Sequence, residues 1–275
     1  MMRYIKLVNF EINRFSKIYL SLLLITLVSQ FAGVIIVTKS LLNDARDIMK
    51  EERLSEAAYI TNYGAIDFNH IANSLLFVGP IALSAVALIF YIFLIWYRDW
   101  FGKNTFIYRL LMLPTSRLSI YLSKATAIFL MVLGLIAFQI IILPMENALF
   151  NSNVPEALLN EMSISTITIA NPILSLIIPS TFTQFLLSYG IGLMIMSILF
   201  TAIMFERSFR IKGIIMGLLY CGIAAVLFLA PVLMEIGNFY FYPNELFGLM
   251  LAIGIILTGL SVWLGAWLLK NRVTV

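Results

Sequence analysis

Long apolar runs separated by short polar segments set the pattern of this chain. The runs cover residues 18–38, 74–97, 125–143, 180–204, 213–233 and 247–269. Each run is close to the roughly 20 residues that an α-helix needs to cross a bilayer, and none carries an ionised side chain in its middle. The pattern therefore predicts an all-α, polytopic membrane protein with six transmembrane helices surrounded by membrane lipid.

The basic residues predict how these helices are oriented. An even number of crossings places both termini on the same side of the membrane. Of the 18 Lys and Arg residues, those on the opposite side are Lys39, Arg46, Lys50 and Arg53. Because short cytoplasmic segments carry an excess of Lys and Arg, we expect both termini to lie in the cytoplasm and the protein to be a multi-pass component of the cell membrane.

Composition narrows the possible classes further. With 275 residues, 61% of them hydrophobic and 12% charged, the chain has no room for a separate soluble domain, so we predict a single transmembrane domain over residues 1–275. The net charge of +4 is explained by cytoplasmic flanks that contact anionic lipid headgroups, and no nucleic-acid partner is expected. The single Cys221 and single His70 predict no metal site.

The sequence also lacks the groups that catalysis requires. The apolar runs contain no nucleophile with a neighbouring base and no paired acids, so we predict no catalytic residue and no enzymatic activity. The chain has no glycine-rich loop ending in Gly-Lys-Ser or Gly-Lys-Thr and therefore no P-loop of its own for ATP. Any energy for transport has to enter from another chain.

The segment before the first run, residues 3–17, has the pattern of an amphipathic helix. Its residues at helical spacing are Tyr4, Leu7, Val8, Glu11, Ile12 and Phe15, while Arg3, Lys6, Arg14 and Lys17 can face headgroups. One interpretation is a surface helix that only anchors the entry of the first span. The other is an elbow helix that also contacts a cytoplasmic partner.

The two long outer segments, 39–73 and 144–179, differ in pattern. Leucines and isoleucines among charges predict a short helix near the membrane surface in the first. The second contains four prolines, beginning with Pro144, so we expect the third span to end at residue 143 and this segment not to cross the membrane.

The cytoplasmic segment 98–124 carries the most specific pattern in the chain. Apolar residues at helical spacing surround Arg109 and predict a short amphipathic helix outside the bilayer core. Pro114 ends this helix, and Thr115 or Ser116 can cap the next one, which continues into the third span. A basic interfacial helix that only fixes the topology is the structural alternative.

This loop resembles the first cytoplasmic loop of bacterial ATP-binding-cassette (ABC) export permeases of the type-two class. The resemblance lies in Asp99, Gly102, an apolar run, Leu113-Pro114-Thr115-Ser116-Arg117 and Lys124. The six-span layout with an N-terminal amphipathic helix is similar over the whole chain, whereas the specific part covers about 27 residues. Asp99 stands where that family often has Glu.

The resemblance implies a permease subunit that assembles with a second permease, identical or homologous, and with two cytoplasmic ABC ATPase subunits that hold ATP and Mg. The permease itself binds no cofactor. In such permeases the loop helix docks in a groove of the ATPase. The implied docking residues are Phe106, Tyr108, Arg109, Leu110, Leu113 and Pro114, with Arg98, Asp99, Lys103 and Arg117 as polar contacts around them.

The sequence contains fewer indications of a substrate. Polar residues predicted at mid-to-outer membrane depth are Gln30, Gln139, Gln184, Ser188 and Tyr189. They either form hydrogen bonds between helices or line a cleft for an amphipathic or hydrophobic substrate such as a peptide antibiotic, a lipid or a drug. A non-transporting membrane scaffold or a bacteriocin-immunity protein has the same topology and is the alternative function.

Overall fold

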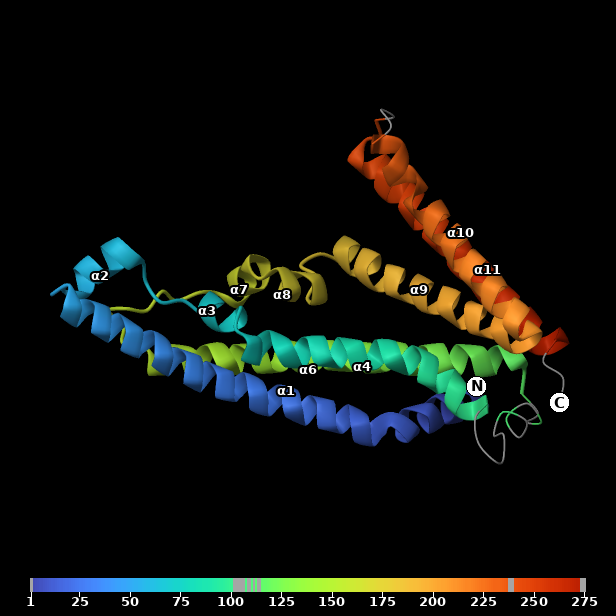
Figure 1. The fold of residues 1–275 in the computed structure, drawn as a ribbon, viewed down its shortest axis with the longest axis horizontal. Coiled ribbons are helices and arrows are strands. Elements are labelled where there is room, and N and C mark those ends of the chain that lie inside the picture. Colours follow the sequence, from blue (N-terminus) through green and yellow to red (C-terminus); the bar gives the residue numbers. More distant parts are fainter. Residues whose placement is uncertain are drawn as a thin grey trace. The chain divides into compact units, whose positions relative to one another are not determined.

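The computed structural model describes residues 2–100, 107, 110, 112, 115–236 and 240–272, and this part is almost entirely helical (Figure 1). Its helices are α1 (Met2–Glu51), α2 (Glu56–Tyr63), α3 (Asn69–Ala72), α4 (Leu75–Trp100), α6 (Arg117–Asn153), α7 (Ile164–Ala170), α8 (Pro172–Ile177), α9 (Phe182–Phe209), α10 (Ile211–Ile236) and α11 (Pro243–Asn271). Among the described residues, six helices, α1, α4, α6, α9, α10 and α11, are long and apolar enough to cross a membrane. The predicted all-α architecture with six such helices is therefore confirmed.

Helix α1 is longer than any predicted element. The segment 3–17, the first apolar run and the start of the outer segment form one helix of 50 residues. No proline interrupts the sequence of α1, so its backbone hydrogen bonds continue without a break. The N-terminal segment is helical as expected, but it is continuous with the span and does not form a separate element.

Helix α6 continues beyond the third apolar run of the sequence. It passes Pro144 and ends at Asn153, ten residues beyond the expected boundary at 143. A proline inside a helix removes one backbone hydrogen bond, and packing can offset this loss. The turns after Pro144 bury Glu146 and Phe150 completely, so packing of this face extends the helix.

The chain divides into two compact units. We call the first the ion-pair unit, which comprises Met1–Arg14, Leu88–Leu130 and Thr183–Val275. The second is the loop unit, which comprises Phe15–Ala87 and Met131–Phe182. Helices α1, α4 and α6 each contribute residues to both units.

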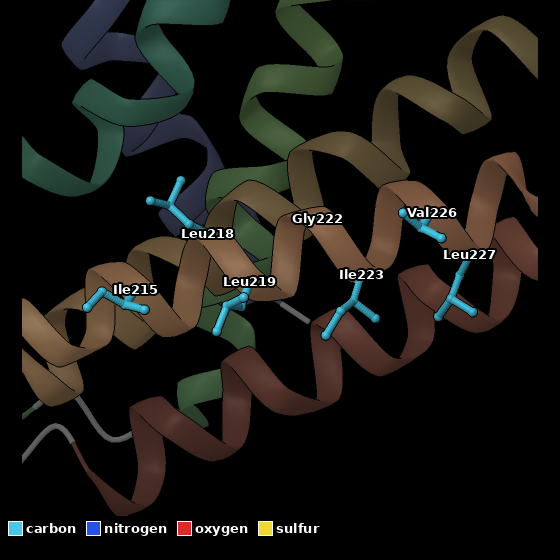
Figure 2. Close-up of a pocket in the computed structure, with 7 residues that line it drawn as sticks. All are labelled: Ile215, Leu218, Leu219, Gly222, Ile223, Val226 and Leu227. Atoms are coloured by element: carbon cyan, nitrogen blue, oxygen red, sulfur yellow. The ribbon is translucent and has the colours of Figure 1, made fainter.

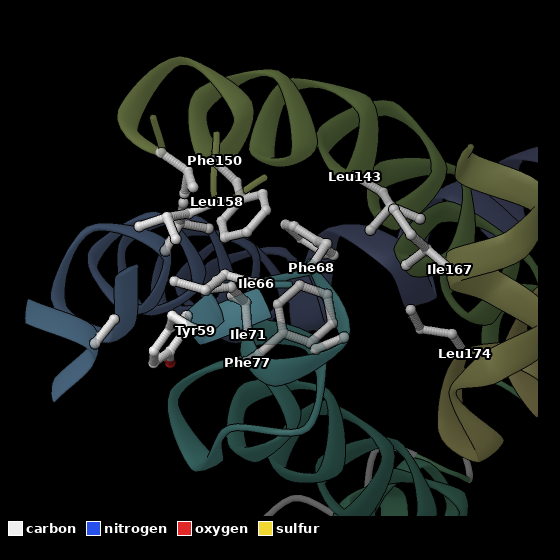
Figure 3. Packing of buried hydrophobic residues seen from close by; sticks show 14 residues of the cluster. Tyr59, Ile66, Phe68, Ile71, Phe77, Leu143, Phe150, Leu158, Ile167 and Leu174 are labelled. Carbon is white, nitrogen blue, oxygen red and sulfur yellow. The ribbon is translucent and has the colours of Figure 1, made fainter. Parts of the chain in front are cut away.

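The loop unit has its own hydrophobic core, to which the segments 39–73 and 144–179 both contribute. Phe68 stacks edge-on against Phe77, with ring centroids 6.0 Å apart, and against Phe150 at 5.7 Å (Figure 3). Backbone hydrogen bonds join the two segments, because Ile66 N–H donates to the Leu158 carbonyl at 2.8 Å. Packing and backbone pairing together make these segments structured parts of the protein.

The ion-pair unit is built around aromatic and hydroxyl side chains. The rings of Trp96, Tyr121 and Phe200 are fully buried and meet in edge-on or tilted pairs with centroids 5.4 to 6.1 Å apart. The Tyr121 hydroxyl donates to the Ser197 carbonyl at 2.9 Å, and the Thr201 hydroxyl donates to the Ser261 carbonyl at 2.7 Å. These bonds connect α6, α9 and α11, since polar groups inside an apolar bundle need partners within the protein.

Helices α9 and α10 approach each other closely. Arg210 joins them in a left-handed backbone conformation, with φ of 55°. A Cβ atom at Gly213 would overlap the carbonyl oxygen of Phe205, and one at Gly217 would lie 3.0 Å from the Ala202 carbonyl oxygen. Glycine at both positions therefore permits the close contact of the two backbones.

Helix α10 carries an open apolar groove of about 560 Å³. Its seven lining residues all belong to α10 (Figure 2): Ile215, Leu218, Leu219, Gly222, Ile223, Val226 and Leu227. A ligand site normally has a few polar groups that orient its ligand, and this lining has no polar side chain. The groove has the character of a surface that contacts lipid chains.

Candidate functional site

A cluster of five charged side chains, of which Glu11, Asp99 and Lys124 are buried and Arg14 and Arg98 half-buried, lies in the ion-pair unit. It begins with Glu11 on α1, whose side chain is 2% exposed. One carboxylate oxygen of Glu11 accepts a hydrogen bond from Lys124 Nζ at 2.6 Å, and the other accepts one from Arg98 Nη2 at 3.1 Å. Glu11 therefore connects the start of α1 with α4 and α6.

Asp99, at the end of α4, is the second acid of the cluster and is completely buried. Its Oδ1 accepts from Arg14 Nη1 at 2.6 Å, and its Oδ2 accepts from Lys124 Nζ at 2.5 Å. Hydrogen bonds between ionised groups at these distances are about twice as strong as neutral ones. Each acid of the cluster thus binds two cations.

Lys124 on α6 is the central cation and is also completely buried. Its ammonium group donates to Glu11, to Asp99 and, at 3.0 Å, to the backbone carbonyl of Ile95. These three bonds use all the hydrogens that a lysine ammonium has. The Trp96 ring covers the same group, with its centroid 5.1 Å from Nζ, so the charge is fully compensated.

Burying such a cluster adds little net stability to a protein. Removing two charges from water costs several kcal/mol for each ion, and their attraction offsets this only when the geometry is good. Breaking a buried pair by deleting one partner, however, costs about 3–5 kcal/mol. The cluster therefore holds α1, α4 and α6 in one register and penalises any other arrangement of these helix ends.

The same cluster closes the base of the segment 98–124. Asp99 and Lys124 lie at its two ends, and their side chains are 2.5 Å apart. Within the segment, Ile107 and Leu110 are buried against Ile120, with Leu7 and Trp100 packed beside them. Ile107 and Leu110 are therefore packed against residues of α1, α4 and α6.

Four of the ten implied docking residues lie within the described part of the chain. Arg98 and Asp99 belong to the buried cluster, and Leu110 is 3% exposed. Arg117 donates to the carbonyl of Leu269, near the end of α11. The remaining six lie outside the described residues: Lys103, Phe106, Tyr108, Arg109, Leu113 and Pro114.

A second contact joins α9 to the end of α4 in the ion-pair unit. The Tyr97 hydroxyl donates to the Glu206 carboxylate. The Arg207 guanidinium lies over the Tyr97 ring, 4.6 Å from its centroid, and near the Trp100 ring at 5.6 Å. Charged and aromatic groups thus surround Tyr97, which directly precedes the segment 98–124.

The polar residues proposed for a substrate cleft fall into two groups. Gln30 and Gln139 lie in the loop unit, where Gln30 Nε2 donates to Gln139 Oε1 and to the Phe77 carbonyl, both at 3.2 Å. Gln184, Ser188 and Tyr189 lie on α9 and are half-buried. For the first two residues, the structure provides the hydrogen bond between helices that the sequence left as one of two options.

Sequence reasoning missed three side chains at these sites. Glu11 and Arg14 are essential to the cluster, and the signal for Glu11 was its position among apolar residues on one face of the segment 3–17. The sequence places Glu146 three residues after the third apolar run, with no sign that it is buried. It is instead buried in α6, and neither of its carboxylate oxygens has a hydrogen-bond partner among the described residues.

Among the described residues, no three His, Cys, Asp or Glu side chains gather into a possible metal site. No family model, curated protein or solved structure matches the chain. Its function therefore has to be inferred from its residues and their geometry.

Proposed function

We propose that this chain is the transmembrane permease subunit of an ABC exporter of the type-two class, with both termini in the cytoplasm. It would assemble with a second permease and with cytoplasmic ATPase subunits that supply ATP and Mg. The substrate class is an amphipathic or hydrophobic molecule. The proposal rests on the similarity of the loop 98–124 to the coupling loop of such permeases and on the six long apolar helices.

The single observation that carries the proposal is the pairing of Asp99 with Lys124 at the base of this loop, 2.5 Å apart and without solvent exposure. A loop that receives force from an ATPase has to pass the displacement to the spans. A freely hinged loop would absorb the displacement. A base closed by buried ion pairs moves the ends of α4 and α6 together.

Glu11 extends this connection to α1. Its carboxylate bonds Lys124 and Arg98, so a displacement of the loop base also acts on the first turns of α1. This contact favours the elbow interpretation of the N-terminal segment, in which it takes part in coupling as well as anchoring. A chain that only served as a scaffold would have no need of a rigid connection between a cytoplasmic loop and three spans.

The test is a pull-down of the tagged full-length protein from its native membrane in a mild detergent. We expect a cytoplasmic ATPase in stoichiometric amount and ATP hydrolysis by the purified complex. Arg109→Ala and Leu113→Ala should reduce recovery of the ATPase, whereas Arg46→Ala, on the predicted outer side, should not. A homomeric protein without ATP hydrolysis would contradict the proposal and favour a scaffold or bacteriocin-immunity protein.

A further inference from the structure

A strip of buried polar side chains runs between α1 and α6 in the loop unit. We call it the polar seam and define it as Gln30, Thr38, Gln139 and Glu146, each at most 4% exposed. Two bonds show that the helices run parallel here, because Tyr19 donates to the Met131 carbonyl and Gln30 donates to Gln139. Glu146 follows Gln139 by seven residues, two helical turns, and so lies on the same face of α6.

Thr38 reaches the same level from α1. It follows Gln30 by eight residues, and in parallel helices this brings it about 12 Å beyond the glutamine pair, close to the level of Glu146, which lies about 10 Å beyond the pair. The buried residues Val34 and Leu143 belong to the same region of the core, and Figure 3 shows Leu143 and Phe150 directed into it. The seam therefore combines polar groups with an apolar wall.

Most polar atoms of the seam lack a partner. Within the described part of the chain, no hydrogen bond reaches Gln30 Oε1, Thr38 Oγ1, Gln139 Nε2 or either carboxylate oxygen of Glu146. Native proteins leave few buried polar atoms unpaired, so each such group calls for an explanation, and a functional role is one of them. Inside a membrane-spanning bundle, an ionisable side chain of this kind indicates a functional site.

The charge of the seam specifies the ligand. No described Lys, Arg or His forms a salt bridge with Glu146, and Lys39, the basic residue next to Thr38, is exposed. Burial without a partner favours the neutral form of a carboxyl group, and a cation is the partner that makes it ionised. Because the surrounding side chains are apolar, the ligand that matches both features carries a cationic group on an apolar body.

We propose that the polar seam binds the cationic group of an amphipathic organic cation, with Glu146 as its counter-ion and Thr38 as a hydrogen-bond acceptor beside it. The four residues of the polar seam form one side-chain hydrogen bond with one another, from Gln30 to Gln139. Few hydrogen bonds are therefore lost when the seam opens to admit a ligand. Insofar as this ligand is the transported substrate, the inference rests on the proposed function and narrows its substrate class to cations.

The experiment uses the purified full-length chain in lipid nanodiscs, without an ATPase. Its probes are tetraphenylphosphonium and tetraphenylborate, which have nearly the same size and shape but opposite charge. We expect saturable binding of the cation only. Glu146→Gln should weaken it by at least about tenfold, because the probe loses its counter-ion. The exposed Glu161→Gln should leave the affinity unchanged.

A second variant provides an independent measurement in case Glu146→Gln does not fold. Thr38→Val keeps the shape of the side chain, removes its hydroxyl and should weaken binding of a primary-ammonium probe, dodecylammonium, by about threefold. This cation, unlike tetraphenylphosphonium, has N–H groups that can donate to the hydroxyl oxygen. Absence of saturable tetraphenylphosphonium binding, or equal affinity in the wild type and in a folded Glu146→Gln variant, would overturn the proposal. Because no ATPase is present, a failed pull-down leaves this result unaffected, and failed binding leaves the permease assignment standing.

Discussion

The two units bury their carboxylates in opposite ways. In the ion-pair unit, Asp99 receives hydrogen bonds from Arg14 and Lys124 at 2.6 and 2.5 Å. In the loop unit, Glu146 is equally buried, yet neither of its oxygens has a partner among the described residues. Burial alone therefore does not tell what a charged residue does.

The difference between Asp99 and Glu146 is that between a residue that connects helices and a residue that can bind a ligand. A carboxylate whose partners are covalently part of the same protein is satisfied in every state that keeps those partners together. A carboxylate without such partners is costly until a ligand arrives, and its cost is recovered on binding. The first arrangement suits the transmission of movement, and the second suits recognition.

Loss of Lys124, the central cation of the cluster, should have the largest effect on the free energy of unfolding. Lys124→Met keeps the length of the side chain but leaves Glu11 and Asp99 each without one of their two partners. We expect the free energy of unfolding to fall by about 3–5 kcal/mol, the usual cost of breaking a buried ion pair. Denaturant unfolding of the purified protein in detergent would measure it.

The matched control is Lys50→Met, which removes an exposed lysine paired with Asp47 at 3.7 Å. This substitution should change the free energy of unfolding by no more than about 0.5 kcal/mol. Equal, small effects of both substitutions would show that the cluster does not hold the three helices together.

In the loop unit, we expect removal of a buried carboxyl group to raise the free energy of unfolding. Glu146→Leu replaces an unpaired buried carboxyl by an apolar side chain of similar size, so it should stabilise the ligand-free protein by about 1–3 kcal/mol. The same unfolding measurement applies, with the exposed Glu161→Leu as control. Destabilisation by Glu146→Leu would mean that the carboxyl already has a partner within the folded protein, and the contrast between the units would disappear.

Substitution in the pair Gln30 and Gln139 should have the smallest effect on the free energy of unfolding. Gln139→Leu removes the acceptor of one hydrogen bond from Gln30, which keeps its second bond to the Phe77 carbonyl. Hydrogen bonds between membrane helices contribute about 0.6 kcal/mol on average, so we expect a loss of this order. A loss above about 2 kcal/mol would indicate that the polar seam holds α1 and α6 together more firmly than its bonds imply.

The six long helices could be predicted because each depends on local properties. An apolar run of about 20 residues has to form a helix in lipid, where every backbone group needs a partner within its own segment. The end of α6 could not be predicted in this way. Pro144 is a local signal to stop, and the packing of Phe150 in the core overrides it.

The candidate sites were predictable in part. The loop 98–124 and the residues Arg98, Asp99 and Lys124 stood out by their order and spacing. Their partners Glu11 and Arg14 lie 85 or more residues away in the chain. No local pattern relates residues so far apart, because their proximity results from the packing of α1 against α4 and α6.

The sequence by itself determined the class of the protein, since the length and hydropathy of each run decide whether it can be solvated by lipid. It also determined which loop carries the most basic and amphipathic pattern. Only the tertiary structure decided which buried charges are paired. Electrostatic stabilisation depends on distances of a few ångströms between side chains from different helices, and those distances exist only after the helices have packed.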